Sequence, residues 1–201
     1  MKRSDDVQVL KKKATWGFVV LFIVIIVFTI IKTSDVKNTD IQNYLVTDSN
    51  LYEEARYMMP TLENLPKYID IDYKYTKKRM FIFVSHSVVL SIQYDDETYK
   101  SEKEKLEKTY EFLNQENIDF KQKGTPVPPH YEFSINTYTF RIVEEVKGNE
   151  GYSMDYPKSF GMVGTSDDEK RIAYLYFYDF DLDVGEANME QFVKSYFDYE
   201  F

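Results

Sequence analysis

The segment from Ala14 to Ile31, ATWGFVVLFIVIIVFTII, constrains this chain most, because it holds eighteen residues without a charge. As an α-helix it would be roughly 27 Å long, close to the thickness of the hydrocarbon core of a thin bilayer. A helix buried in a water-soluble protein normally keeps one polar stripe, whereas this segment is apolar on all sides. The sequence therefore predicts a transmembrane helix over residues 14–31.

The charges that flank this segment predict its orientation. Residues 1–13 form a basic tail with five basic and two acidic side chains, and three of its lysines stand directly before the apolar segment. Basic residues concentrate on the cytoplasmic side of a membrane, so we expect a cytoplasmic N-terminus and everything after Lys32 outside. No small-x-small cleavage site follows the segment, which favours an uncleaved anchor over a cleaved signal peptide. The predicted location is the cell membrane, crossed once.

The composition of the remaining chain limits its partners. The whole chain carries a formal charge of −9 and the tail +3, which leaves −12 on residues 32–201. Such an acidic segment argues against binding nucleic acid or anionic lipid. The 18 tyrosines and 15 phenylalanines favour strands and a folded domain. The chain has no cysteine, which excludes disulfides and thiol chemistry and is more typical of a bacterial envelope with one membrane.

The sequence outside the membrane divides into a stalk and one domain. Residues 32–48 are polar without a sustained period, which predicts a stalk with a short helical piece near 41–46. A compact domain is expected over residues 49–201. Its first predicted helix begins at Asn50 and ends before Pro60. The second runs from 95 to 116 with an amphipathic pattern, and the third runs from 186 to 197.

Alternating apolar and polar residues predict the strands of this domain. The expected strands cover residues 69–76, 80–84, 88–94, 131–135, 137–146, 159–164 and 171–181, with turns at 77–79 and 85–87. The last of them is apolar or aromatic on both faces, which predicts a central strand. Gly161 and Gly164 indicate a bulge or a close neighbour. The order of elements predicts an α+β fold, one domain with a mostly antiparallel sheet and packed helices.

Candidate catalytic residues are scarce in this sequence. His86 and His130 are the only imidazoles, and they fall in a predicted turn and in a proline-rich loop. Ser85 and Ser87 flank His86, but adjacent residues point apart, so the triplet does not form a hydrolase triad. The chain has neither a glycine-rich phosphate loop nor a paired-histidine metal motif. The sequence therefore nominates no catalytic residue.

One acidic stretch has the spacing of a calcium loop. Asp179, Asp181 and Asp183 alternate, and Glu190 follows eleven residues after the first of them. The glycine that a calcium loop needs at its sixth position falls one place late, at Gly185. The same alternation arises where a strand ends with one solvent-facing acidic edge. Calcium is the one cofactor that the sequence suggests, and both interpretations stay open.

Three tyrosines form the most suggestive binding pattern. Tyr174, Tyr176 and Tyr178 share one face of the strand predicted at 171–181. Aromatic rings with polar tips line grooves that bind glycans or peptides. The same pattern arises when tyrosines pack in a half-covered sheet under a helix, with their hydroxyls at the edge of the covered area. The stripe is therefore a candidate ligand site with a simpler packing alternative.

Three segments carry a resemblance to known sequences. LYEEARYMMP (residues 51–60), YPKSFGMVG (156–164) and YLYFYD (174–179) resemble uncharacterised single-pass membrane-anchored proteins of Gram-positive bacteria. The resemblance covers most of the predicted outer domain and implies an envelope location. It carries no assigned activity, so it transfers no catalytic residue.

These features favour a non-enzymatic, membrane-anchored extracytoplasmic domain that binds a protein or an envelope component. The alternative is an envelope enzyme that uses carboxylates alone, as glycan hydrolases do with two acidic residues. A third hypothesis is a module that requires calcium for folding.

Overall fold

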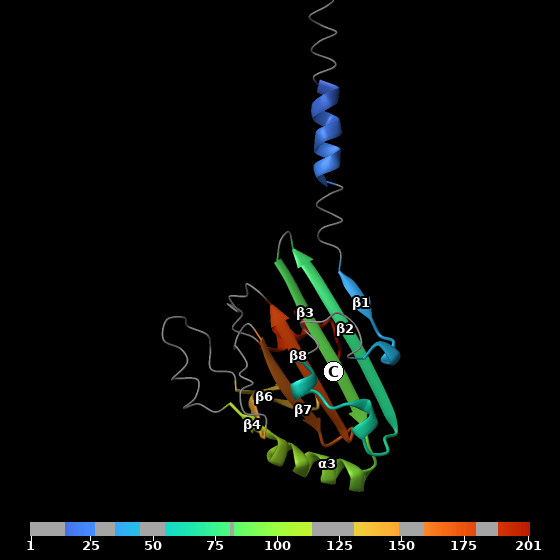
Figure 1. Cartoon of the computed structure of the whole chain (residues 1–201), viewed down its shortest axis with the longest axis vertical. Helices are drawn as coiled ribbons and strands as arrows, with labels where there is room; N and C mark the ends of the chain where they lie inside the picture. The colour runs from blue at the N-terminus through green and yellow to red at the C-terminus, as the bar shows by residue number, and fades with distance from the viewer. Residues whose placement is uncertain are drawn as a thin grey trace, which may run out of the picture.

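The computed structural model describes residues 15–26, 35–44, 55–80, 83–113, 131–148, 159–179 and 189–201. Within these residues, eight strands form one antiparallel sheet with helices against both of its faces (Figure 1). This architecture confirms the predicted α+β fold with an antiparallel sheet.

Seven strands follow one path in the order β1-β2-β3-β8-β7-β6-β4, and β5 pairs with the edge of β6 that also carries β4. Their bounds are Val36–Asn38 for β1, Asp70–Met80 for β2, Phe83–Gln93 for β3, Tyr110–Phe112 for β4, Glu132–Ile135 for β5, Tyr138–Val146 for β6, Ser159–Ser166 for β7 and Arg171–Asp179 for β8. β8 lies between β3 and β7, so the strand predicted at 171–181 is central, as expected.

β2 and β3 form one long hairpin rather than three short strands. Each has eleven residues, and the pairing runs from Asp70–Gln93 to Met80–Phe83. The predicted turns at 77–79 and 85–87 are therefore wrong. The basic residues at 77–79 stay extended in β2, where Arg79 is exposed and Lys77 and Lys78 are half-buried. The polar stretch around Ser87 stays in β3 because its side chain finds a partner, the carbonyl of Tyr196 at 2.8 Å.

The sheet domain begins earlier than the sequence suggested. β1 pairs with β2, with Val36 opposite Lys77. Tyr44 is buried, and its hydroxyl donates to the carbonyl of Pro60 at 2.7 Å. A 3₁₀ turn, η1 (Ile41–Asn43), stands where a short helical piece was expected. Residues 36–44 thus belong to the sheet domain, where the sequence indicated a stalk.

The long amphipathic helix is shorter than its pattern indicated. α3 (Asp96–Thr109) is capped by Asp95, whose carboxylate accepts from the backbone N–H groups of Glu97 and Thr98. The prediction continued it to residue 116. The chain instead turns into β4 at Tyr110, which pairs with Val146 of β6. This pairing spans 36 positions of sequence, so helical spacing could not reveal it.

An aromatic layer covers one face of the sheet. It is built by α5 (Met189–Phe197), which packs over β2 and β3. The ring of Phe192 lies 4.9 Å from that of Phe177 in β8, in an edge-to-face arrangement. After the helix, the ring of Phe201 contacts those of Tyr138 and Phe140. Residues 186–188 of the predicted helix lie outside the described residues.

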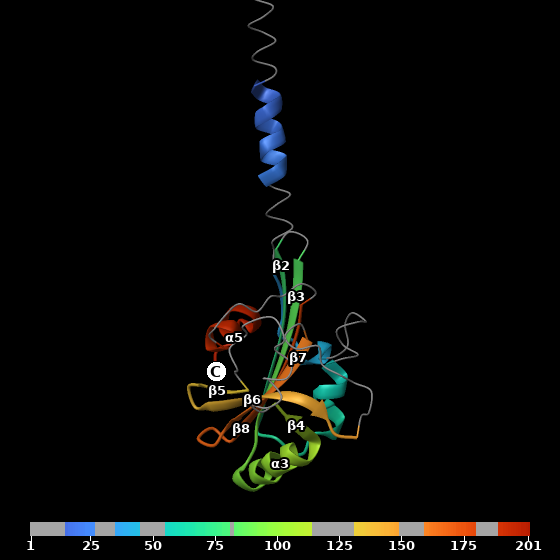
Figure 2. The same cartoon turned by 90° about the vertical axis from the view of Figure 1, so that its left-hand side faces the viewer.

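The opposite face carries α3, a helical turn at residues 55–58 and the 3₁₀ turn η2 (Leu62–Asn64), so that Figure 2 shows the sheet between two layers. Residues 55–58 end before Pro60, as expected, whereas the predicted start at Asn50 lies outside the described part of the chain. Met58 packs so closely on Gly161 that a Cβ there would lie 2.6 Å from its Cγ. Gly161 thus has the close neighbour that its sequence context indicated.

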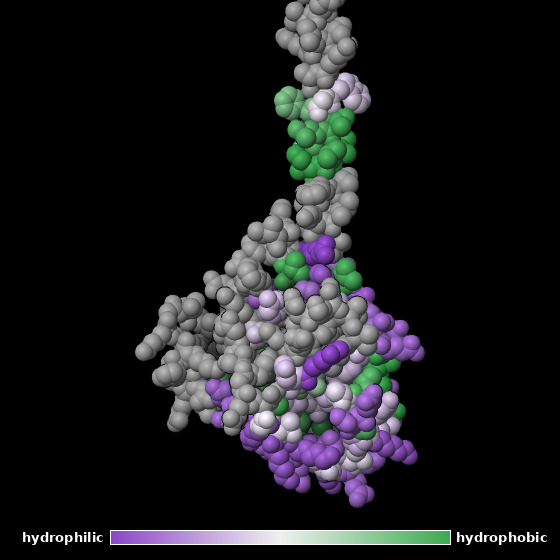
Figure 3. Space-filling model, in the orientation of Figure 1, coloured by the Kyte–Doolittle hydropathy of each residue, from purple (hydrophilic) through white to green (hydrophobic). Residues whose placement is uncertain are grey.

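Residues 15–26 form a helix that stands apart from the sheet domain (Figure 1). The side chains from Phe18 to Ile26 are each 42–74% exposed, and Figure 3 shows them as an apolar surface. None of the helices in the described ranges is both long and apolar enough to cross a membrane. Residues 14 and 27–31 of the predicted span lie outside those ranges.

Candidate functional site

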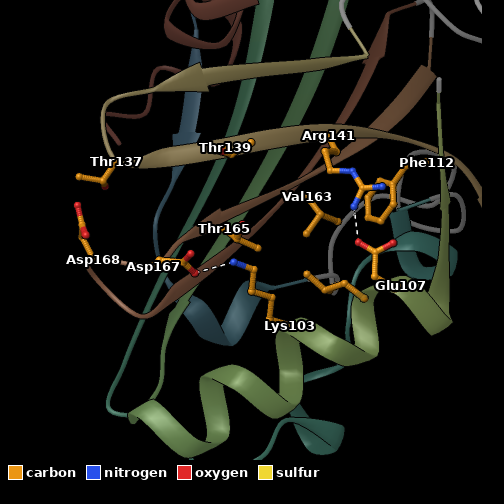
Figure 4. Close-up of a pocket in the computed structure, with 11 residues that line it drawn as sticks. Lys103, Glu107, Phe112, Thr137, Thr139, Arg141, Val163, Thr165, Asp167 and Asp168 are labelled. Carbon is orange, nitrogen blue, oxygen red and sulfur yellow. Dashed lines mark hydrogen bonds and ion pairs between the residues drawn. The ribbon is translucent and has the colours of Figure 1, made fainter. Parts of the chain in front are cut away.

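A groove of about 340 Å³ lies between α3, β6 and β7, on the sheet face opposite α5 (Figure 4). α3 contributes Lys103 and Glu107, and β6 contributes Arg141. The turn between β7 and β8 contributes Asp167 and Asp168. The groove therefore combines charges of both signs, brought together from three separate stretches of the chain.

Arg141 forms one end of the groove. Its guanidinium carbon lies 3.7 Å from the centroid of the Phe112 ring, and Nη1 donates to the carboxylate of Glu107. Stacking on an aromatic ring holds a guanidinium plane in one orientation. Its Nε and Nη2 atoms have no hydrogen-bond partner among the described residues. Arg141 is thus held in place, and two of its donor atoms have no partner in the part of the chain that the structure describes.

Asp167 and Lys103 form the other end. Nζ of Lys103 lies 2.6 Å from Oδ1 of Asp167, and the same oxygen accepts a hydrogen bond of 2.6 Å from the Tyr99 hydroxyl. These two bonds, the lysine first, lower the pKa of the Asp167 carboxyl. The neighbouring Asp168 is exposed and has no ion-pair partner in the part of the chain that the structure describes. The Lys103–Asp167 ion pair therefore lies next to the exposed carboxylate of Asp168.

The turn at residues 167–170 is fixed by local hydrogen bonds. Oγ of Ser166 accepts from the backbone N–H of Glu169 at 3.2 Å, and Nζ of Lys170 donates to the carbonyl of Asp167 at 2.6 Å. Lys170 adopts a left-handed conformation with φ of 55°. This turn joins β7 to β8 and brings the two aspartates to α3.

Threonines line the groove between its two ends. Thr139 of β6 lies directly opposite Thr165 of β7. The Thr137 hydroxyl donates to Oε1 of Glu169 at 2.8 Å, and Figure 4 shows Asp168 directed towards Thr137. The hydroxyl of Thr139 has no hydrogen-bond partner among the residues described. The floor thus has a hydroxyl group midway between the charged ends.

The chemistry of the groove suits binding better than proton transfer. A general acid needs a raised pKa, whereas the pKa of Asp167 is lowered. Glu107 is held by Arg141. His86 lies elsewhere, in β3, with Nδ1 2.8 Å from the Tyr75 hydroxyl. Hydrogen bonding and charge pairing to a ligand are what this arrangement can do.

The tyrosines singled out by the sequence lie outside this groove. Tyr174 and Tyr176 are buried on the sheet face opposite α5, and burial raises the pKa of Tyr174. Tyr178 is half-buried, and its ring centroid lies 6.3 Å from that of His86. Only Tyr178 among the three keeps appreciable exposed surface.

The acidic stretch is described only in part. Asp179 is buried at the end of β8, whereas Asp181 and Asp183 lie outside the described residues. Oε1 of Glu190, in α5, pairs with Nζ of Lys194 at 2.7 Å. No group of three or more metal-binding side chains occurs within the described ranges. The calcium site stays a prediction.

The groove residues were not identified from the sequence. The charges of α3 have the pattern of a solvated helix face, and residues 165–170 have the composition of a polar loop. One available signal was the alternation of Thr137, Thr139 and Arg141, which places three polar side chains on one face of a predicted strand. Which helix faces them depends on pairings distant in sequence.

No protein-family model, no curated protein and no solved structure matches this chain. The resemblance to membrane-anchored proteins of Gram-positive bacteria therefore stays a prediction from the three segments quoted above.

Proposed function

We propose that this chain is a single-pass, membrane-anchored extracytoplasmic domain that binds a component of the cell envelope in the groove between α3, β6 and β7. The observation that carries the proposal is where the groove lies relative to the N-terminal segment. The chain enters the sheet at Val36, opposite Lys77, near the tip of the β2–β3 hairpin. α3 leaves from the other end, after Gln93.

The length of the hairpin makes this separation large. Strands rise about 3.3 Å per residue, so eleven residues span on the order of 35 Å. A domain anchored through its N-terminal segment therefore presents the α3 end away from the bilayer. A groove at that end can reach envelope material that a flat membrane-proximal surface cannot.

The helix at residues 15–26 supports the anchor. Its apolar side chains from Phe18 to Ile26 make no enclosing contact with the sheet domain, since each stays at least 42% exposed. Covering this surface with lipid removes it from water, which is favourable by about 25 cal/mol per Å². With the basic tail inside, the sheet domain lies on the outer side.

Photocrosslinking in living cells tests this function. A photoreactive phenylalanine analogue replaces Thr139, at the floor of the groove, or Lys194, on the opposite sheet face, in the full-length chain. We expect an envelope adduct from position 139 that is absent from position 194. An additional Arg141→Gln substitution should abolish it. Equal adducts from both positions, or none from position 139, would overturn the proposal.

A further inference from the structure

Among the described residues, groups of three kinds in the groove lack a partner: N–H groups of Arg141, the Thr139 hydroxyl and the Asp168 carboxylate. Their order along the groove indicates a ligand class. Resting on the proposed function, we propose that the groove binds a short, extended zwitterionic peptide, with a carboxylate of the ligand at Arg141 and an ammonium at Asp168.

Arg141 provides the carboxylate end. Its guanidinium is already stacked on Phe112, so little side-chain freedom is lost when a ligand binds. A guanidinium fork binds a carboxylate through two parallel N–H···O bonds. The present partner, Glu107, is 61% exposed, and exposed ion pairs contribute only about 0.2–1 kcal/mol. A ligand carboxylate can therefore bind the N–H groups that have no partner among the described residues, or displace Glu107 at low cost.

Asp168 provides the ammonium end. The charge of its neighbour Asp167 is already matched by Lys103, whereas Asp168 has no ion-pair partner in the described part of the chain. An ammonium group of the ligand can therefore form an ion pair with the Asp168 carboxylate. The groove carries two cationic and three anionic side chains in all, which disfavours a polyanionic ligand such as a polyphosphate.

The distance between the two ends sets the length of the ligand. Asp168 lies beside Thr137, and Arg141 follows four residues later on β6 (Figure 4). Four extended residues span about 13 Å, so a peptide of about four residues reaches from one end to the other. The hydroxyl of Thr139, at the midpoint, has no partner within the described ranges and can form a hydrogen bond with a peptide amide. A neutral glycan would leave both charged ends unmatched.

Calorimetry with matched peptides tests the ligand class. The full-length chain in phosphatidylcholine nanodiscs is titrated with tetra-alanine that has both termini free, with its C-terminal amide and with its N-acetylated form. Each capped form should bind about tenfold more weakly than the free peptide, because each lacks one charge-assisted contact.

Two substitutions assign each terminus to its partner. Arg141→Gln should weaken binding of the free peptide about tenfold and leave binding of the C-terminal amide unchanged. Asp168→Asn should weaken binding of the free peptide about tenfold and leave binding of the N-acetylated peptide unchanged. Arg79→Gln and Glu104→Gln remove the same charges outside the groove, and we expect affinities within about twofold of the native chain. Circular dichroism melts confirm that each variant folds.

The outcomes separate this inference from the proposed function. Equal affinity for free and capped peptides, or no binding of any of them, overturns the zwitterionic ligand. If the photoadduct at position 139 nevertheless forms, envelope binding stands and only the ligand class is wrong. If excess tetra-alanine suppresses that adduct, the free peptide and the envelope-borne ligand share one site, and both proposals are supported.

Discussion

The carboxylate of Asp198, near the C-terminus, lies 2.7 Å from Nζ of Lys37 in β1, the first strand of the sheet. Oδ2 of Asp198 also lies 2.6 Å from Nζ of Lys74 in β2. One carboxylate from the end of the chain thus holds the short edge strand at which the N-terminal segment enters. Under the proposed membrane anchor, a pull from the bilayer acts first on this contact.

The Asp198 contact makes part of the stability pH-dependent. Its hydrogen bonds to Lys37 and then Lys74 lower the pKa of the Asp198 carboxyl to about 2. Because the folded-state pKa is lowered, the contribution is complete above the unfolded value near 4 and is lost as the pH falls through the folded value of about 2. Asp198 is 40% exposed, so solvent screening keeps this contribution within about 0.2–1 kcal/mol.

We expect Asp198→Asn to lower the free energy of unfolding by that amount at pH 7 and by much less at pH 2, where about half of the carboxyl groups are protonated. Asparagine tolerates the left-handed backbone of this position, where φ is 51°, so the substitution isolates the charge. Urea unfolding of both chains at the two pH values measures the difference. An equal loss at pH 2 would show that the carboxylate charge is not the cause.

Removal of the hydroxyl should lower the free energy of unfolding at Tyr110 but not at Tyr94. The buried Tyr110 hydroxyl donates to the carbonyl of Met58 at 2.6 Å, whereas the buried Tyr94 hydroxyl has no hydrogen-bond partner among the residues that the structure describes. Tyr110→Phe should lower the free energy of unfolding by about 1–3 kcal/mol, since it leaves a buried carbonyl unpaired. Tyr94→Phe should not lower it, because the lost hydroxyl had only a desolvation cost. Denaturant unfolding compares the two, and a larger loss for Tyr94→Phe would contradict this packing.

Gly164 and Gly161 should differ in their tolerance of a methyl group. A Cβ at Gly164 would overlap the rigid ring of Phe140, whereas one at Gly161 would meet only the flexible end of Met58. We expect Gly164→Ala to cost about 1–3 kcal/mol through overpacking, and Gly161→Ala to cost less than about 1 kcal/mol. Thermal melts of both variants rank them. The reverse ranking would mean that the ring of Phe140 moves more readily than Met58.

The fold class was predictable because period-2 alternation is local. The strands at 131–135, 137–146 and 171–181 stand out by alternation or by apolar length, and each is a strand in the structure. β1 and β4 were missed because three-residue strands carry too little pattern. Their existence depends on partners distant in sequence, Lys77 for Val36 and Val146 for Tyr110.

Polar residues inside strands caused the largest error. The stretch Ser85-His86-Ser87 has turn-like composition, but the fold gives the side chains of His86 and Ser87 partners. The Tyr75 hydroxyl lies 2.8 Å from Nδ1 of His86, and Ser87 bonds a carbonyl of α5. The groove could not be predicted because it also depends on tertiary contacts. Its charges come from segments 26 or more residues apart, and only the folded sheet places α3 beside β6 and β7.

Cysteine accessibility in intact cells tests the central claim most directly, because the native chain contains no cysteine. Ser4→Cys places a thiol in the basic tail, and Glu104→Cys places one on the exposed surface of α3. With a membrane-impermeant maleimide, we expect Glu104→Cys to be labelled in intact cells and Ser4→Cys only after lysis. Labelling of Ser4→Cys in intact cells, with Glu104→Cys protected until lysis, would contradict the anchored, outward-facing domain.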